Sequence, residues 1–318
     1  MTSYLTLIRQ QIGHHKIPLL FASACVLDEM GRVLWQHRTD FNRWGLPGGI
    51  LELEESLPEC VAREVYEESG LEVEPKELVG VYSSPDFDVF YPNNDRVHQV
   101  TACFTCHVVG GNLRIDNDET LNLEWFPQDT PPPTFPWYRA MANDLLLHED
   151  SPSFDRGSPG NRECDKPFFE ILQERLNETP LILPIATAFI QDGKKRVVLL
   201  HNNVQDVWEL PGGYLHAGER IDQTVIYEVR KKTGLVIQPI RLMGIYSDSP
   251  LFGISPYGTR CKLVNFVFQC AIIQGKIEGE GTTQSHARFF SQDAIAPLST
   301  ASHCHLQHIL THQDKVFF

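Results

Sequence analysis

The sequence has no long apolar segment, since none of its runs reaches the roughly 18 residues from which a membrane span is predicted. The first residues, MTSYLTLIRQQIGHHK, are polar and amphipathic and lack the apolar core of a secretion signal. A hydrophobic content of 42% with 21% charged residues is typical of a globular protein. We therefore expect a cytoplasmic protein with no membrane contact.

Cysteines with metal-ligand spacing are also scarce. The only CxxC pair, Cys103 and Cys106, falls in the strand-like run VTACFTCHVV, where residues three apart point to opposite faces. No second CxxC completes a zinc set. Without an export signal, the eight cysteines are expected to be free thiols, and buried strand positions are favoured over a zinc or redox site for this pair.

Excess basic charge is missing as well. The net charge is −14, and residues 1–164 hold 26 acidic against 12 basic side chains, whereas residues 165–318 hold 15 of each. A basic surface or a helix-turn-helix module would be needed to grip a nucleic acid, so we expect no nucleic-acid partner. Carboxylates concentrated in one half suit either a cation site or a solvated face.

The chain is an internal duplication. A constant shift of 164 residues places residues 44–49 on 208–213 and Gly70-Leu71 on Gly234-Leu235. The apolar spacing of an opening helix is repeated too, with Tyr4, Leu7, Ile8 and Ile12 matching Phe168, Ile171, Leu172 and Leu176. We predict two domains, 1–147 and 168–318, joined by a linker over 148–167 that is rich in Pro, Gly, Ser and charge.

Within each repeat, the expected order is helix, strand, hairpin strand, loop, helix, several strands and a closing helix. Strands are expected over 20–28, 31–38, 77–84 and 97–110, and helices over 56–70 and 135–147. Ser56 is a suitable N-cap for the first of these helices, and Gly70 stands where a left-handed residue ends it. Strands with flanking helices predict a layered α/β fold with a mixed sheet.

Three carboxylates converge on the helix expected over 56–70. Glu64 precedes Glu67 and Glu68 by three and four residues, which puts all three on one helix face. Like charges in this arrangement repel unless a cation lies among them, and hard oxygen ligands suit Mg²⁺ or Mn²⁺. The alternative is a solvated acidic helix face. That alternative leaves the glycine turn before the helix, Arg63 among the acids and Gly70 after them unexplained.

This segment resembles the signature of the Nudix hydrolase family. The fixed places of that signature are matched by Gly49, Glu55, Arg63, Glu64, Val65, Glu67, Glu68, Gly70 and Leu71. The pattern is long and allows no gaps, and the resemblance covers residues 1–150. It implies an α/β/α sandwich domain that hydrolyses a diphosphate bond with the help of a divalent metal.

The resemblance also implies roles for individual residues. The Gly49 carbonyl, Glu64, Glu67 and Glu68 would hold Mg²⁺, and Arg63 would pair with Glu55 to orient the helix. A further catalytic acid usually comes from a late loop of the family. The candidate here is Glu119, and its rivals are Asp116, Asp118 and Glu124.

The second repeat departs from the signature at the metal-binding places. Tyr227 replaces the arginine, Lys231 and Lys232 replace the two adjacent glutamates, and Thr283 stands at the place of Glu119. Two ammonium groups repel a divalent cation. The repeat keeps fold positions such as Gly213, Glu219, Glu228 and Gly234. We therefore predict a catalytically inactive second domain.

The expected substrate is a small nucleotide, and its identity is not readable: ADP-ribose, other nucleoside-diphosphate sugars, dinucleoside polyphosphates, nucleotide cofactors and oxidised nucleoside triphosphates all fit. The alternative function is a nucleotide sensor or scaffold that binds without hydrolysis. The aromatic residues considered for base stacking are Trp44, Phe87, Phe90 and Tyr91. The histidines of the last helix, His305, His308 and His312, favour a surface helix over a metal site. The duplication predicts that the two halves pack as an internal pseudo-dimer.

Overall fold

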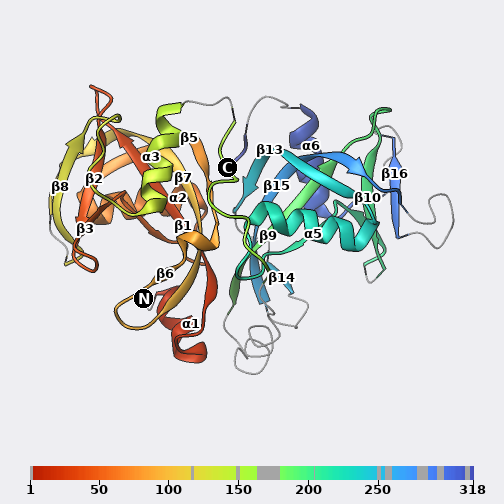
Figure 1. Cartoon of the computed structure of the whole chain (residues 1–318), viewed down its shortest axis with the longest axis horizontal. Helices are drawn as coiled ribbons and strands as arrows, with labels where there is room; N and C mark the ends of the chain where they lie inside the picture. The colour runs from red at the N-terminus through yellow and green to blue at the C-terminus, as the bar shows by residue number, and fades with distance from the viewer. Residues whose placement is uncertain are drawn as a thin grey trace.

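The computed structural model describes residues 3–115, 118–147, 151–162, 180–203, 205–248, 252–254, 260–277, 286–291, 297–311 and 316–318. They form two α/β halves that lie side by side (Figure 1). Each half contains a mixed sheet, so the fold class expected from the sequence is confirmed. No helix in these described ranges is both long enough and apolar enough to span a membrane.

The elements of the second half recur about 164 residues after those of the first. The first half comprises α1 (Tyr4–Ile12), β1 (Ile17–Leu27), β2 (Val33–Arg38), β3 (Arg43–Gly45), β4 (Gly48–Ile50), α2 (Leu57–Ser69), β5 (Leu71–Tyr82), η1 (Pro85–Phe87), β6 (Val89–Phe90), β7 (Arg96–Gly111), β8 (Thr120–Phe126) and α3 (Pro136–Leu147). The second half comprises β9 (Leu181–Ile190), β10 (Val197–Asn202), β11 (Val207–Glu209), β12 (Gly212–Tyr214), α5 (Ile221–Thr233), β13 (Val236–Tyr246), β14 (Phe252–Ile254), β15 (Arg260–Gln274), β16 (Ala287–Phe290) and α6 (Thr300–Thr311). The helix expected over Phe168–Leu176 lies outside the described residues.

The sheets of the two halves follow one plan. In the first half the strand order is β3-β2-β1-β7-β5, and β4, β6 and β8 pair with β1, β7 and β2. In the second half one sheet has the order β12-β9-β15-β13, and β11-β10-β16 form another. The central pairs, β1 with β7 and β9 with β15, are parallel, whereas the other pairs are antiparallel.

Alternation along β1 places a helix on each face of the first sheet. Ala22 and Ala24 point into the core that contains Val65 of α2, and Cys25 points into the core that contains Met141 of α3. The result is a three-layered α/β/α arrangement, which buries β1 completely along most of its length. Val65 of α2 and Met141 of α3 therefore belong to separate cores on the two faces of the sheet.

The CxxC pair obeys the same alternation. Cys103 contacts Cys25 on the α3 face at an Sγ–Sγ distance of 3.7 Å, and Cys106 belongs to the core under α2. Burial raises the pKa of the Cys106 thiol. Buried strand cysteines are thus the correct interpretation of this motif.

The segment after α3 is ordered and packed. Ser153 extends the edge of β5, because its carbonyl accepts a hydrogen bond from the Val81 amide at 2.7 Å and its amide donates to Val79 at 3.1 Å. Arg156 forms an ion pair of 2.6 Å with the buried Asp144. The same segment also contacts the second half, because Nη1 of Arg220 donates to the Asp155 and Gly157 carbonyls at 2.6 and 2.7 Å.

Contacts across the boundary come in pairs related by the repeat. Phe154, just after α3, packs on Phe268 of the second half, and Phe318 packs on Phe104 of the first, with ring centroids 5.3 and 5.2 Å apart. All four rings lie in or against one hydrophobic core that includes residues from both halves. This reciprocal packing fits the internal pseudo-dimer expected from the duplication.

The last helix is less exposed than expected. His305 is buried, its ring lies 4.1 Å from that of Tyr246, and His308 stacks on Phe317. Burial lowers the pKa of His305 to about 4. The surface interpretation of this helix face is wrong for His305, and His312 lies outside the described residues.

Candidate functional site

Helix α2 carries the acidic residues singled out in the sequence, and its ends are firmly fixed. Ser56 and Glu59 form a capping box, in which the Glu59 carboxylate accepts a hydrogen bond from the Ser56 amide at 2.7 Å. Gly70 ends the helix in the left-handed conformation with φ of 74°. The Ser56 cap and the Gly70 end were readable in the sequence, and they fix where α2 begins and ends.

The turn before α2 brings its backbone against the acids. A Cβ atom on Gly49 would lie 2.2 Å from Oε1 of Glu64, and one on Gly48 would lie 2.2 Å from the Ala22 carbonyl. Gly48 also has a φ of +147°, which favours glycine. The two glycines are therefore required for β4 to pair with β1 while the Glu64 carboxylate rests on the Gly49 backbone.

Arg63 gathers the carboxylates of the α2 face. Its Nε and Nη2 donate to Glu55 at 2.8 and 2.6 Å, so this pair is bidentate. Its Nη1 donates to Glu64 at 2.8 Å and to Glu67 at 3.1 Å. The ion pair with Glu55 implied by the family resemblance is present, and the same guanidinium also neutralises two of the acids expected to bind metal.

Glu64 and Glu68 are protonated more readily than ordinary glutamates. Burial raises the pKa of Glu68 to about 8, although Arg38 lies 4.0 Å away and the Gly48 amide donates to its carboxylate at 2.9 Å. Burial likewise raises the pKa of Glu64 to about 7, against the opposing attraction of Arg63. Shifts of this kind cluster at functional sites, which favours a functional role over a solvated acidic helix face.

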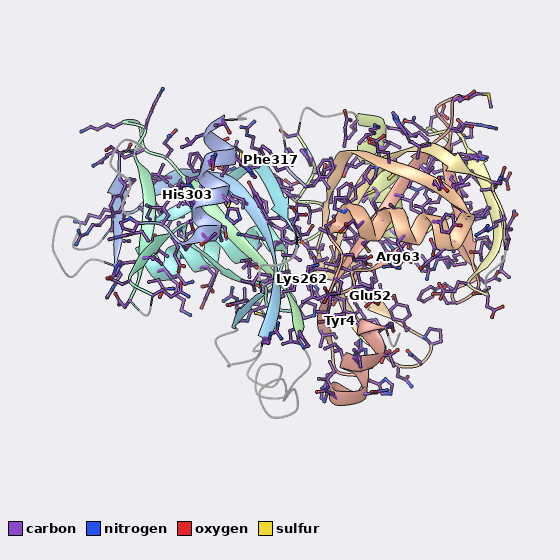
Figure 2. All side chains as sticks on the ribbon, turned by 180° about the vertical axis from the view of Figure 1, so that it is seen from behind. Tyr4, Glu52, Arg63, Lys262, His303 and Phe317 are labelled. Carbon is purple, nitrogen blue, oxygen red and sulfur yellow. The ribbon has the colours of Figure 1, made fainter. Side chains whose placement is uncertain are left out.

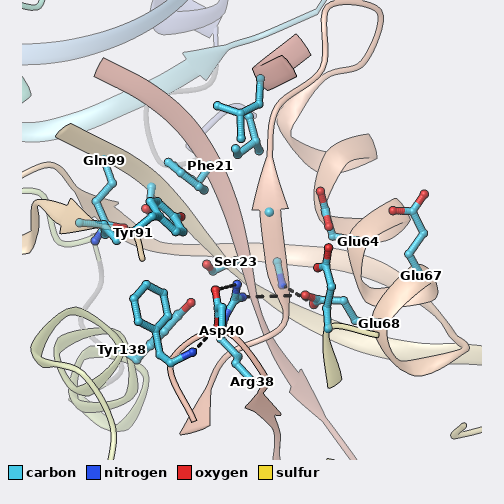
Figure 3. A pocket seen from close by; sticks show the side chains of 18 of the residues that line it. Phe21, Ser23, Arg38, Asp40, Glu64, Glu67, Glu68, Tyr91, Gln99 and Tyr138 are labelled. Atoms are coloured by element: carbon cyan, nitrogen blue, oxygen red, sulfur yellow. Dashed lines mark hydrogen bonds and ion pairs between the residues drawn. The ribbon is translucent and has the colours of Figure 1, made fainter. Parts of the chain in front are cut away.

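A cavity of about 720 Å³ opens beside these acids. It is lined on one side by Glu64, Glu67 and Glu68, which Figure 3 shows projecting from one helix. Asp118 and Glu119 also line it, from the turn that precedes β8. Of the other acids considered in this region, Glu124 is an exposed residue of β8 that does not line the cavity, and Asp116 lies outside the described residues.

The opposite side of the cavity is aromatic, and most of these residues were missed. Of the four aromatic residues considered for stacking, only Tyr91 lines it. Phe87 is buried, Trp44 packs edge-on against Phe126, and Phe90 is exposed. The aromatic residues that line the cavity are Phe21, Phe41, Tyr91, Phe135, Trp137 and Tyr138, and Figure 3 shows Phe21, Tyr91 and Tyr138 across from the acids. The run FPWY at 135–138 was the available signal, because three of its four residues are aromatic.

The floor of the cavity is polar and comes from β1 and β7. Ser23, Gln99 and Thr101 point into it from positions on one face of the parallel pair. Gln99 is 5% exposed, and its Nε2 has no hydrogen-bond partner among the residues that the structure describes. Figure 3 shows this side chain beside Tyr91, on the far side from the acids. A buried donor without an acceptor is costly, so this amide is suited to an acceptor atom on a ligand.

At the equivalent place in the second half, basic side chains of the protein are paired with the glutamates. Arg162, from the linker, donates to Glu219 and to Glu228 at 2.9 Å each, and its guanidinium lies 3.8 Å from the centroid of the Tyr227 ring. Lys232 lies 3.3 Å from Glu228 and donates to the Gly212 carbonyl. Arg162 thus does for this half what Arg63 does for the first, from a position the sequence comparison missed. Thr283 lies outside the described residues.

The donors beside α2 fit a small divalent cation by their chemistry. The Gly49 carbonyl and three carboxylates lie on one turn and one helix face, and hard oxygen donors are what Mg²⁺ takes. Within the described ranges, no three acidic, histidine or cysteine side chains already form a coordinating group. On the α2 face the three carboxylates have other partners: Arg63 donates to Glu64 and Glu67, and the Gly48 amide donates to Glu68.

Comparison with known proteins identifies the fold family of both halves. The model of the NUDIX domain matches residues 19–145 and again residues 182–308. The chain is 38% identical over 104 residues to a MutT-like protein of Streptomyces ambofaciens, a match covering 33% of this chain and 60% of that protein. It is 39% identical over 89 residues to an ADP-ribose pyrophosphatase of Methanocaldococcus jannaschii, covering 28% of this chain and 48% of that protein.

Other similar proteins act on larger substrates by name. The chain is 33% identical over 143 residues to the NAD-capped RNA hydrolase NudC of Pseudomonas aeruginosa, covering 43% of this chain and 46% of that protein. These three matches span between 46% and 60% of the relatives' own length. Among solved structures, a MutT Nudix hydrolase from Burkholderia pseudomallei is 27% identical with a TM-score of 0.35, covering 41% of this chain and 98% of that one.

Proposed function

Because this chain belongs to the NUDIX family, whose domain it carries twice, we propose that its first domain hydrolyses the diphosphate bond of a nucleoside-diphosphate derivative in a magnesium-dependent reaction. The observation that carries the proposal is that Glu64, Glu67 and Glu68 line the same cavity as a group of aromatic side chains. One side suits a metal-bound diphosphate, and the other suits a nucleobase.

The proposed metal ligands are the Gly49 carbonyl, Glu64, Glu67 and Glu68. Bound among these oxygens, Mg²⁺ or Mn²⁺ would neutralise diphosphate charge and activate water for attack at phosphorus. Arg63 keeps Glu64 and Glu67 on the cavity side of α2 and is itself held by Glu55. It acts as a positioning residue and a local counter-charge for the acid cluster.

Glu119 is the proposed general base. It lines the cavity with Asp118, in a turn held by a hydrogen bond of 3.0 Å from the Thr39 amide to the Glu119 carbonyl. A carboxylate exposed at the cavity mouth can accept a proton from attacking water and release it to solvent. Among the described residues that line the cavity, Asp118 is its rival, and a comparison of Glu119→Gln with Asp118→Asn, by the pH dependence of kcat, separates the two.

The nucleoside end of the substrate is proposed to lie between the aromatic wall and Gln99. We expect Gln99→Leu to raise KM about tenfold while kcat changes less than about threefold, because the lost hydrogen bond holds the ground state and the transition state equally. Steady-state kinetics with the best substrate of the panel described below measure both constants. Glu124→Gln, outside the cavity, is the control. An unchanged KM in the Gln99 variant would remove this residue from the substrate site.

Metal binding should release protons. Burial raises the pKa of Glu64 to about 7 and that of Glu68 to about 8, so protons compete with the cation at neutral pH. Apparent Mg²⁺ affinity should therefore rise by about tenfold or more from pH 6 to pH 7 and level off above about pH 8. Calorimetry in two buffers of different ionisation enthalpy counts the released protons. Binding without proton release at pH 7 would contradict this assignment.

The second domain is proposed to be catalytically inactive. Arg162 and Lys232 already neutralise Glu219 and Glu228, and Lys231 adds a further positive charge. A divalent cation placed among these groups would meet repulsion from two ammonium groups and a guanidinium. Inactivity is therefore supported by two observations: two metal-binding carboxylates are missing, and the remaining glutamates are already paired with cationic side chains.

A substrate panel with product analysis by mass spectrometry tests the proposed function. The panel contains ADP-ribose, other nucleoside-diphosphate sugars, dinucleoside polyphosphates, nucleotide cofactors and oxidised nucleoside triphosphates. NAD-capped RNA belongs in it as well, because similar proteins carry that name and the expected lack of a nucleic-acid partner is untested. Magnesium-dependent release of a nucleoside monophosphate supports hydrolysis. Tight binding of a nucleotide without turnover would favour the sensor or scaffold alternative.

A further inference from the structure

The first backbone amide of α2 is hydrogen-bonded to a side chain of the other domain. The amide of Leu57, the first residue of α2, donates at 2.9 Å to Oγ of Ser247, which follows β13 in the second domain. The contact is repeated in reverse, because the amide of Ile221, the first residue of α5, donates at 3.0 Å to Oγ of Ser83. Both serines are buried. Each domain therefore satisfies one of the open amides at the start of the other domain's helix.

A second reciprocal contact holds the loop in front of each helix. Nζ of Lys262, on β15, donates to the carbonyls of Leu53 and Glu55, the former at 3.2 Å. At the place equivalent to Lys262 in the first domain, Nε2 of His98 contacts the Glu219 carbonyl at 3.1 Å. Lys262 is 1% exposed and lies at the boundary between the halves (Figure 2). Burial lowers the pKa of its ammonium group.

The consequences of these paired contacts differ between the two domains. Glu55, whose carbonyl is held by Lys262, uses its carboxylate to hold Arg63, and Arg63 holds Glu64. A shift of this loop therefore reaches the proposed metal ligands through two ion pairs. In the second domain the equivalent loop leads to Glu219 and Glu228, which Arg162 of the linker already fixes.

We propose that Ser247 and Lys262 of the inactive domain are positioning residues for hydrolysis in the first domain: they fix the start of α2 and the loop that orients Arg63. The proposal rests on the proposed function of the first domain. It assigns the retained second copy a specific task, because a rigid neighbour holds the acids in place without contributing a ligand.

The matched pair Ser247→Ala and Ser83→Ala tests the proposal in the full chain. Both variants remove one buried hydroxyl from the same boundary and leave one helix amide without its acceptor, so both should lower Tm to a similar extent. Ser247→Ala should also lower kcat about tenfold and raise the Mg²⁺ concentration needed for half-maximal rate. Ser83→Ala should keep both within about twofold of wild type. Ser247→Thr, which retains the hydroxyl, should restore the rate.

Lys262→Met provides a second variant at the loop itself. Methionine has a similar length and tolerates burial, but it cannot donate to the two carbonyls. Its kcat should fall by a factor similar to that of Ser247→Ala. Equal kinetic losses in Ser247→Ala and Ser83→Ala, or wild-type kinetics in both Ser247→Ala and Lys262→Met, would overturn the positioning role.

Hydrogen exchange keeps the proposal testable without turnover. In Ser247→Ala, amide exchange should accelerate at the start of α2 and stay unchanged at the start of α5, and Ser83→Ala should show the reverse. If wild-type protein hydrolyses nothing in the panel, the proposed function fails, and this pattern still tests whether the second domain orders α2. If each variant changes amide exchange equally at the starts of α2 and α5, the idea that the second domain orders α2 is refuted.

Discussion

Replacing Glu68 with glutamine in the full chain should lower magnesium-dependent kcat by at least about a hundredfold and leave the fold intact. The loss follows because one of the proposed metal ligands loses its charge, and metal stabilisation of the transition state is worth several kcal/mol. The fold should tolerate the change because burial raises the pKa of Glu68 to about 8, so the metal-free protein at neutral pH holds this side chain mainly in its neutral form. Glutamine has nearly the same shape as that form.

The hydrogen bond that Glu68 makes also survives the substitution. The Gly48 amide donates to the carboxylate at 2.9 Å, and the amide oxygen of glutamine can accept the same bond. Circular dichroism and Tm should therefore match wild type closely. Glu67→Gln should reduce kcat to a similar degree, although Glu67 is more exposed. Near-wild-type turnover by Glu68→Gln with Mg²⁺ would refute the assignment of this site.

The matched control lies at the same place in the second domain. Lys232→Gln removes the charge that corresponds to Glu68 and should leave kcat within about twofold, because the second domain is proposed to catalyse nothing. The double comparison also limits any contribution of that domain, since the residual rate of Glu68→Gln is the largest rate it can supply. A Lys232→Gln protein with a strongly altered kcat would show that this place takes part in catalysis.

The parts of the fold that depend on local signals were predictable from the sequence. The helix expected over 56–70 is α2, with Ser56 as its cap and Gly70 in the left-handed conformation, because capping depends on neighbours within a few residues. The repeat was predictable for a similar reason, since a constant shift of 164 residues leaves no ambiguity of alignment. The strand expected to begin at residue 77 instead begins at Leu71, directly after the helix-ending glycine.

The parts that depend on distant partners were not predictable. Arg162 occupies the role of Arg63 in the second domain from a position 57 residues before Glu219 along the chain, and no spacing rule links them. The aromatic wall combines Phe41, from the turn after β2, with residues at the start of α3. Ser247 and Lys262 read as ordinary residues at the end of β13 and within β15 until the two halves are packed together.

A chain that ends at residue 162 should be far less stable than the full protein, with Tm lower by at least about 10 °C. Cutting there removes the partner surface of Tyr4 and Phe104, two large buried side chains. Tyr4 packs at the boundary with its hydroxyl accepting from the Ile182 amide at 2.9 Å, and Phe104 packs against Phe318. Exposing one such side chain costs about 1.5–3 kcal/mol. Several of them together approach the roughly 5–15 kcal/mol of a typical domain.

Self-association should not rescue this fragment. The full chain places a neutral second half beside an acidic first half, and two copies of the acidic half would repel each other across the same boundary. Low salt should therefore keep the fragment monomeric, and addition of the separately produced second half should raise its Tm. Calorimetry and sedimentation at two ionic strengths measure both effects. A monomeric fragment with unchanged Tm and unchanged kinetics would mean that the halves are independent domains, and the shared core would then contribute nothing to either.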